Sequence, residues 1–228
     1  MKNRQLKDLL YEQVARIGKA LASPKRLELL EMLAQGEKSV ETLTAELAID
    51  VKLASAHLKA LKAACLVQTR REGKYIFYRL SDDGVAQLGI ALRTVAERHL
   101  DEMRRAMRQL VAAPKLLTPL TRTELMAQVL RGDVVVIDVR PRSEYDAAHL
   151  PHAISMPLAE LERRIRELPQ DRDIVAYCRG PFCMLSDEAV QRLVLHGYRA
   201  QKIMDGVSEW RAAGVALEST LAVAGAAQ

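Results

Sequence analysis

The sequence predicts a chain of two domains, the first mainly α-helical and the second α/β with a parallel sheet. In residues 5–110, apolar residues recur at helical spacing, except in an alternating stretch at 67–80. Beyond 112–120, a segment with two prolines, short apolar runs alternate with helical stretches, which is typical of parallel strands joined by helices. The 228 residues can form two hydrophobic cores. We therefore predict domains at 1–111 and 121–228, joined by a linker at 112–120.

The first domain begins with short helices. Helical spacing and the N-cap residues Ser23, Ser39 and Asp50 predict helices over 5–22, 24–34, 40–47 and 51–64. VQTRREGKYIFYRL (67–80) alternates apolar and polar residues and predicts a β-hairpin that turns at Glu72-Gly73, with a basic tip. Ser81-Asp82-Asp83 then starts a helix predicted to reach about residue 110, since acidic residues suit the positive end of a helix dipole.

This first half also carries the positive charge. Residues 1–113 hold 20 Lys and Arg against 14 Asp and Glu, whereas residues 114–228 hold 14 against 15. A basic half suggests a polyanionic partner. Two short helices followed by a basic hairpin predict a winged helix-turn-helix, in which the second helix enters the major groove and the wing reaches phosphates. We therefore expect this half to bind double-stranded DNA.

The predicted helix 51–64 divides into a core face and a DNA face. Leu53, Leu58 and Leu61 are expected to face the core, while the small Ala54 and Ala56 allow close approach to DNA. The expected base-reading residues are Lys52, Ser55 and Lys59, and the expected phosphate or minor-groove contacts are Arg70, Arg71 and Lys74.

In the second domain, short apolar runs predict strands at 134–138, 173–177 and 201–204. Helical stretches predict helices at 121–130, 158–168 and 185–196. Thr121 and Glu124 form a capping-box pattern at the start of the first of these helices. DVR followed by EY predicts a buried ion pair that supports the first strand, with Asp138, Arg140 and Glu144 in structural roles.

AYCRGPFCMLSDE (176–188) contains two of the three cysteines. Cys178 follows a strand at the carboxyl edge of the predicted sheet, where ligand sites form. Inward backbone N–H groups and a following helix N-terminus stabilise an anion, so we expect an easily ionised, nucleophilic thiol. Gly180 allows the loop to curl, Arg179 is expected to attract an anionic donor, and Cys183 offers a second thiol that can attack a persulfide.

Three segments of the first half resemble the ArsR/SmtB-type bacterial repressors over about residues 10–110: ALASPKRLELLEML, KLASAHLKALKAACLV and RREGKYIFYRL. The resemblance implies a homodimer that pairs through its first and last helices and leaves operator DNA when an inducer binds. SVETL (39–43) lacks the cysteine pair of many metal-sensing members. His99, Asp101 and Glu102 are the alternative metal ligands, although an exposed polar helix face is the simpler interpretation, and we predict no metal site. Cys65 stands where the family commonly has glycine, and we expect it to be a small buried residue.

Three segments of the second half resemble a single-domain rhodanese over about residues 118–218: VVVIDVRPRSEYDAAHLPHAISMPL, VAYCRGPFCMLSDEAV and MDGVSEWRAAGVAL. The resemblance implies sulfurtransferase chemistry, in which the loop cysteine, here Cys178, takes a sulfane sulfur from a donor. Many thiosulfate-using members have a cation where this chain has Cys183, which weakens the case for thiosulfate. Phosphoryl chemistry needs an arginine at the position of Met184, so we do not expect it in this chain.

Our leading hypothesis is a DNA-binding transcriptional repressor whose rhodanese-like domain senses reactive sulfur through persulfide or disulfide chemistry at Cys178 and Cys183. The alternatives are an active sulfurtransferase with an autoregulatory DNA-binding domain and a metal-triggered repressor, so enzymatic turnover stays open. The expected partners are double-stranded operator DNA, a second copy of the chain and a persulfide, polysulfide or thiosulfate donor, with no cofactor. The sequence shows no apolar run long enough for a membrane span and no signal peptide, so we expect a cytoplasmic protein.

Overall fold

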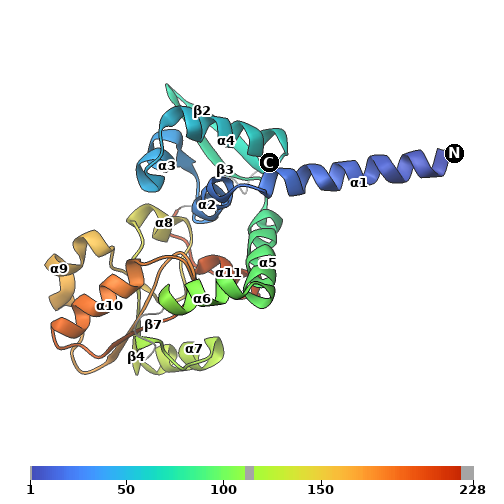
Figure 1. The fold of residues 1–228 in the computed structure, drawn as a ribbon. Helices are drawn as coiled ribbons and strands as arrows, with labels where there is room; N and C mark the ends of the chain where they lie inside the picture. The colour runs from blue at the N-terminus through green and yellow to red at the C-terminus, as the bar shows by residue number, and fades with distance from the viewer. Residues whose placement is uncertain (1, 111–115, 222–228) are drawn as a thin grey trace, which may run out of the picture. The chain divides into compact units, whose positions relative to one another are not determined.

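The computed structural model describes residues 2–110 and 116–221 (Figure 1). The chain divides into two compact units, residues 1–93 and 94–228. The two predicted fold classes are confirmed, since the first unit is mainly helical with a small antiparallel sheet and the second contains a parallel sheet. The predicted linker at 112–120 falls partly on residues 111–115, which lie outside the described residues, so the boundaries at 111 and 121 stay a prediction.

The first unit is a helix-turn-helix with a wing. Its helices are α1 (Lys2–Leu21), α2 (Pro24–Leu33), α3 (Val40–Leu47), α4 (Val51–Ala63) and the first part of α5 (Asp83–His99). Its strands are β1 (Lys38–Ser39), β2 (Val67–Glu72) and β3 (Tyr75–Leu80), in the order β1-β3-β2. The backbone N–H of Thr42 donates to Ser39 Oγ (3.2 Å) and that of Leu53 donates to Asp50 Oδ1 (2.9 Å), so two of the three predicted N-caps are confirmed. Ser23 precedes α2 at the predicted position, but its side chain makes no capping hydrogen bond, and Pro24 begins the helix.

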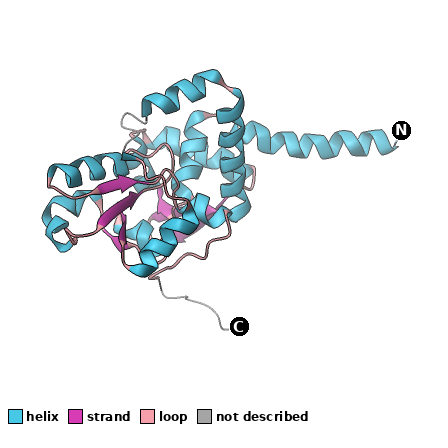
Figure 2. Ribbon diagram, turned by 90° about the horizontal axis from the view of Figure 1, so that it is seen from below, coloured by secondary structure: helices cyan, strands magenta, loops and turns pink. Residues whose placement is uncertain are grey.

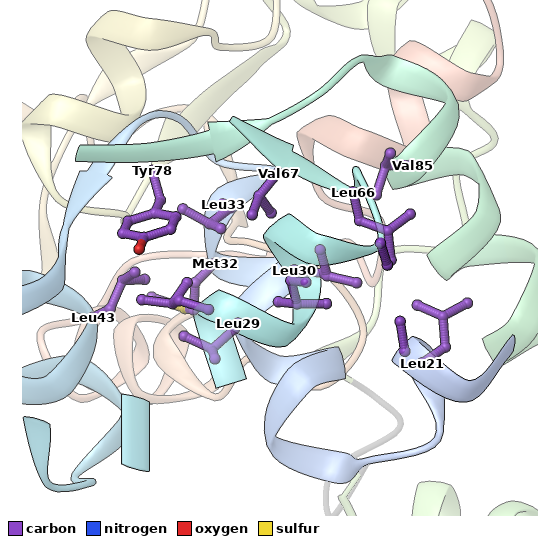
Figure 3. Packing of buried hydrophobic residues seen from close by; sticks show 14 residues of the cluster. Leu21, Leu29, Leu30, Met32, Leu33, Leu43, Leu66, Val67, Tyr78 and Val85 are labelled. Carbon is purple, nitrogen blue, oxygen red and sulfur yellow. The ribbon is translucent and has the colours of Figure 1, made fainter. Parts of the chain in front are cut away.

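One cluster of buried apolar residues, most of them leucines, holds these elements together. Leu29 and Leu33 of α2 pack with Leu43 of α3 and Tyr78 of β3 (Figure 3). Leu58 of α4 is fully buried in the same cluster. The core therefore fixes α4 against α2 and leaves the opposite side of α4 to solvent.

Several local predictions in this unit are wrong. Leu53 is 41% exposed and Ala54 is fully buried, so the buried face of α4 consists of Ala54, Leu58 and Leu61. Glu72 pairs with Tyr75, so the hairpin turns one residue later than predicted, at Gly73 and Lys74. Cys65 is exposed rather than buried, and its φ of +60° is the left-handed conformation that favours glycine.

The long helix predicted up to residue 110 is in fact two helices, α5 (Asp83–His99) and α6 (Asp101–Leu110). Basic residues end α5 and acidic residues begin α6, which suits the negative and positive ends of the two helix dipoles. Arg104 donates to the carbonyl oxygen of Arg98 (2.5 Å) and pairs with Asp101, so its side chain bridges the break.

The second unit alternates strands and helices. Besides α6, its helices are α7 (Arg122–Arg131), α8 (Arg142–Ala147), η2 (Leu158–Glu160), α9 (Leu161–Arg164), η3 (Ile165–Glu167), α10 (Leu185–Leu195) and α11 (Val207–Ala212). Its strands are β4 (Val134–Asp138), β5 (Ile154–Ser155), β6 (Asp173–Tyr177) and β7 (Ala200–Lys202). Thr121 and Glu124 form the predicted capping box of α7. β1, β5, α8 and α11 are not predicted from the sequence, because they are too short to show a periodicity.

The sheet has the order β5-β4-β6-β7, and its neighbouring strands are parallel (Figures 1 and 2). Ile137 and Ala176 pack on one face with α9 and α10, while Val136 and Tyr177 pack on the other with α7 and α11. The prediction of a parallel sheet covered on both faces is confirmed. This arrangement brings the carboxyl ends of β4 and β6 together, and Cys178 directly follows β6.

Neither a membrane span nor a metal centre is visible in the part of the chain that the structure describes. No helix there combines the length and apolar character needed to cross a bilayer. No group of three or more His, Cys, Asp or Glu residues there is placed to hold a metal ion. His99 ends α5 and Asp101 begins α6 with Arg104 as its partner, so one chain does not assemble the alternative metal site.

Candidate functional site

The thiol of Cys178 is buried at the carboxyl edge of the sheet. The residue is only 2% exposed, between the end of β6 and the first turn of α10. Its Sγ lies 3.4 Å from Ser186 Oγ, which belongs to that first turn and is itself 2% exposed. The carbonyl oxygens of Cys183 (3.4 Å) and Gly180 (3.9 Å) also lie within reach of the thiol.

These surroundings favour the thiolate form of Cys178. Burial by itself raises the pKa of the thiol, because it removes the charged form from water. Hydrogen bonds from the Cys183 thiol and the Ser186 hydroxyl oppose this effect, as do bonds from the backbone of Ser186 and Gly180. Together they outweigh burial and lower the pKa of Cys178 to about 6. The two nearby carbonyl oxygens can accept from a neutral thiol, but the donors are more numerous, so the group is a thiolate at neutral pH.

Cys183 is the hydrogen-bond partner of that thiolate. Its own pKa is raised, first because its thiol donates to Cys178 and then because it is mostly buried. The pair therefore consists of one thiolate and one thiol that share a proton. Both residues are free cysteines in the structure. The two thiols thus differ in protonation although they stand five residues apart on the same loop.

The loop is held at Arg179 by its side chain and by its backbone. Nη2 of Arg179 donates to Glu144 Oε1 (2.6 Å) and Nε donates to Oε2 (3.0 Å), and Glu144 is only 1% exposed. A Cβ on Gly206 would lie 2.1 Å from the carbonyl oxygen of Arg179, so only glycine allows this close approach. Gly180 has a φ of +154° and is buried. The geometry therefore places Arg179 in an ion pair within the loop scaffold.

Asp138 and Arg140 form a second ion pair beneath the loop, with both side chains fully buried. Arg140 Nε donates to Asp138 Oδ1 (2.9 Å), and Arg140 Nη2 donates to the carbonyl oxygen of Ala148 (2.7 Å). The hydroxyl of Tyr177, the residue before Cys178, donates to Asp138 Oδ2 (2.7 Å). These bonds connect the ends of β4 and β6, which is a supporting arrangement.

The predicted DNA-facing residues of α4 share one side of that helix. Lys52 and Lys59 are exposed and Ser55 is half-buried, on the side opposite the buried Leu58 and Leu61. Their spacing of three and four residues puts them in one row along the helix. The row has the size and polarity to meet base edges, and its role in reading DNA stays a prediction.

The wing differs from its predicted form in one important contact. Arg70 donates to Glu37 Oε1 from Nη2 (2.6 Å) and to Glu72 Oε2 from Nη1 (2.6 Å). The bond to Glu37 is the main reason why the pKa of Arg70 is raised. Arg71 donates to the carbonyl oxygen of Gly73 (3.1 Å), and Lys74 remains exposed at the turn. The structure thus holds Arg70 in ion pairs, whereas Lys74 is directed to solvent.

Sequence reasoning missed three residues of these sites: Ser186, Glu37 and Gly206. Ser186 carried a usable signal, because a hydroxyl in the first turn of the helix behind Cys178 lies near the anion pocket. Glu37 carried none, since it lies 33 residues from Arg70 in the sequence. Gly206 was equally invisible, because its contact with Arg179 arises only from the fold.

Comparison with known proteins agrees with this geometry. Residues 23–69 match the family described as bacterial regulatory protein, arsR family, and residues 121–213 match the rhodanese-like domain. The chain is 42% identical over 212 residues to the HTH-type transcriptional regulator Rv0324 of Mycobacterium tuberculosis, covering 93% of each protein. The chain belongs to the ArsR-type transcriptional regulators that carry a rhodanese-like domain. The predicted resemblance of the first half to the ArsR-type repressors and of the second half to the rhodaneses is thereby confirmed.

Two partial relatives match one half of this regulator each. A sulfurtransferase of Allochromatium vinosum is 32% identical over 84 residues, which are 36% of this chain and 77% of that protein. A solved structure titled as the homodimeric winged helix-turn-helix DNA-binding domain of a possible ArsR-family regulator from Mycobacterium bovis is 45% identical, with a TM-score of 0.40. The match covers 42% of this chain and 89% of the solved chain.

Proposed function

We propose that this regulator is a homodimeric repressor that binds operator DNA through α4 and the wing, and that sulfur loading at Cys178 controls the binding. The observation that carries the proposal is the thiolate of Cys178 beside the thiol of Cys183, in a chain that belongs to a family of transcriptional regulators. The first unit has no comparable pair, because its one cysteine, Cys65, stands alone and exposed. The inducer therefore acts on the second unit.

The proposed chemistry has two balanced steps. First, the Cys178 thiolate attacks the outer sulfur of a persulfide, R–S–SH; the sulfur–sulfur bond breaks, R–S⁻ leaves, and Cys178–S–SH forms. Second, the Cys183 sulfur attacks the inner sulfur of that persulfide, HS⁻ leaves, and a disulfide joins the two residues, while the proton of Cys183 passes to the departing sulfide. The two thiols are oxidised and the transferred sulfur is reduced to sulfide, so no further oxidant is needed.

A dimer is supported by the exposed apolar face of α1. The helix projects from the core of its own unit (Figure 2). Five of its large apolar residues are 51–68% exposed: Leu6, Leu9, Leu10, Tyr11 and Val14. A single helix with this pattern is normally buried against a partner. We propose that α1 of a second copy covers it. A DNA-bound regulator of this kind works in the cytoplasm, where thiols are kept reduced until sulfur arrives.

Contacts within the second unit connect the sulfur loop to the predicted linker. Asp187, next to Ser186 in α10, pairs with Lys202 of β7, whose side chain is only 5% exposed. The carbonyl oxygen of Lys202 accepts from the backbone N–H of Thr118 (2.9 Å), and Leu117 bridges to the same residue. A change of the first turn of α10 on sulfur loading therefore has a direct route to residues 117–118.

The test is operator binding by fluorescence anisotropy at fixed salt, with and without inorganic polysulfide, followed by peptide mass mapping. We expect the wild-type protein to release its upstream DNA and to carry added sulfur or a Cys178–Cys183 disulfide. Cys178→Ser should keep the DNA bound, while Cys65→Ser, the matched control, should respond like the wild type. If Cys178→Ser still releases DNA fully on polysulfide addition, the proposal fails.

The second candidate function is an active sulfurtransferase whose DNA-binding unit regulates its own expression. It is favoured by the thiolate of Cys178 and by the similarity to the Allochromatium sulfurtransferase. It predicts repeated turnover with a persulfide donor and a thiol acceptor, together with DNA affinity that does not respond to sulfur. Absence of turnover across several donors would rule it out.

A further inference from the structure

The loop around Cys178 has no net positive charge to offer a substrate. Its single cation between residues 178 and 184 is Arg179, and the buried carboxylate of Glu144 pairs with it through both Nε and Nη2. The ion pair has two short contacts and only 15% exposure on the arginine side. It is therefore a stable part of the loop scaffold.

The charged groups of the helix behind the loop are also balanced. In α10, Glu188 pairs with Arg192, and Asp187 pairs with Lys202 of β7. Both acidic residues in the first turn of α10 are thus paired with a cation. What remains to receive a ligand is the backbone and hydroxyl donors that already stabilise the Cys178 thiolate.

The exposed side chains on either side of Cys183 are apolar. Phe182 is 42% exposed and Met184 is 51% exposed, and these two residues flank Cys183. Apolar side chains leave the charge of an oxyanion without a partner at this point.

Sulfane donors differ in the leaving group that the site must stabilise. Transfer from thiosulfate to the Cys178 thiolate gives Cys178–S–S⁻ and expels sulfite, so the thiolate attacks a dianion and three oxygens carry the departing charge. Transfer from a hydropolysulfide or an alkyl persulfide gives Cys178–S–SH and expels HS⁻ or a thiolate, each with one charge on a polarisable sulfur. Only the first reaction needs a cationic clamp on oxygen.

We infer that this site takes sulfur from donors with a sulfur leaving group, such as hydropolysulfides and apolar persulfides, and discriminates against thiosulfate, because Glu144 neutralises Arg179 and the exposed side chains on either side of Cys183 are apolar. The inference rests on the proposed sulfur loading of Cys178 and specifies its substrate class. Glu144 and Met184 are specificity-determining residues that act without contact with the transferred sulfur.

The test measures the initial rate of sulfur loading at Cys178 of the full chain by peptide mass mapping, with inorganic polysulfide or thiosulfate at equal concentration. Loading from thiosulfate should be about tenfold to hundredfold slower, the effect of one or two charge-assisted hydrogen bonds to the leaving oxyanion. Met184→Arg adds a cation at an exposed position and should raise the thiosulfate rate about tenfold. Met184→Gln is the uncharged control of similar length and should leave it unchanged.

The outcomes separate this inference from the proposed function. Equal wild-type rates with both donors would overturn the substrate class while leaving sulfur sensing intact. No gain with Met184→Arg, in a variant whose thermal unfolding matches the wild type, would overturn the charge argument. No loading at Cys178 from either donor would overturn both proposals together.

Discussion

The hydroxyl of Ser186 should account for a measurable part of the acidity of Cys178. Ser186→Ala removes a donor 3.4 Å from the sulfur and leaves the backbone N–H of the same residue in place. A hydrogen bond to a charged group contributes about 1.5–3 kcal/mol, which corresponds to about one to two pH units. The pKa of Cys178, about 6 in the wild type, should therefore rise to about 7–8. At pH 7 the thiolate fraction should fall from about nine-tenths to between a half and a tenth.

The assay is the ultraviolet absorbance of the thiolate as a function of pH, with a Cys178→Ser protein subtracted to isolate this one group. Ser208→Ala is the matched control, because Ser208 is another buried serine and its hydroxyl has no hydrogen-bond partner among the described residues. It should leave the titration unchanged. A wild-type midpoint near the ordinary value of 9.0, or an unchanged midpoint in Ser186→Ala, would refute this account of the pocket.

The same pKa also fixes the sign of a stability effect. Folding lowers the pKa of Cys178 from 9.0 to about 6, so the folded state holds fewer protons than the unfolded state between these values. The stabilisation is fully present above pH 9, declines as the pH falls toward 6, and is lost below the folded pKa. The stability difference between the wild type and Cys178→Ser, measured by chemical unfolding, should therefore grow from pH 6 to pH 9. A difference that is constant across this window would contradict the assignment.

Three further predictions concern the wing, the recognition helix and the loop scaffold. Glu37→Gln should remove one of the two ion pairs of Arg70, leaving the one with Glu72, and tighten operator binding a few-fold, with a salt dependence steeper by about one ion; an unchanged salt slope would place Arg70 away from phosphate. Lys59→Ala should weaken binding, by an amount that differs between operator and random DNA if the residue reads bases, as anisotropy titrations on both will show. Gly206→Ala should destabilise the second unit by about 1–3 kcal/mol in thermal unfolding, because the new Cβ clashes with the carbonyl of Arg179.

The sequence was sufficient to predict the structure correctly wherever the pattern is local. Ser39, Asp50 and the Thr121–Glu124 capping box begin their helices as predicted, because each side chain bonds a backbone group within three residues. The buried run at 134–138 forms β4 with the predicted bounds. The position of Cys178 at the carboxyl edge of a parallel sheet followed from strand and helix order alone.

Local patterns gave wrong predictions where a contact from elsewhere in the fold decides the local structure. The apolar period of α4 did not separate Leu53 from Ala54, since the space available in the core sets which of two neighbours is buried. The helix predicted up to residue 110 shows continuous helical periodicity, and its break at Leu100 depends on dipole ends and on Arg104. Cys65 is exposed and has a left-handed backbone conformation, and composition reveals neither property.

The sequence by itself thus determined the two fold classes, the order of their elements and the place of the reactive cysteine, because these depend on periodicity and on nearest neighbours along the chain. Only the tertiary structure decided the partners of the charged groups: Glu37 with Arg70 across 33 residues and Glu144 with Arg179 across 35. Long side chains find their partners after the backbone has packed, so their pairing is a property of the assembled fold. That pairing decides which cations remain available for DNA and for a sulfur donor.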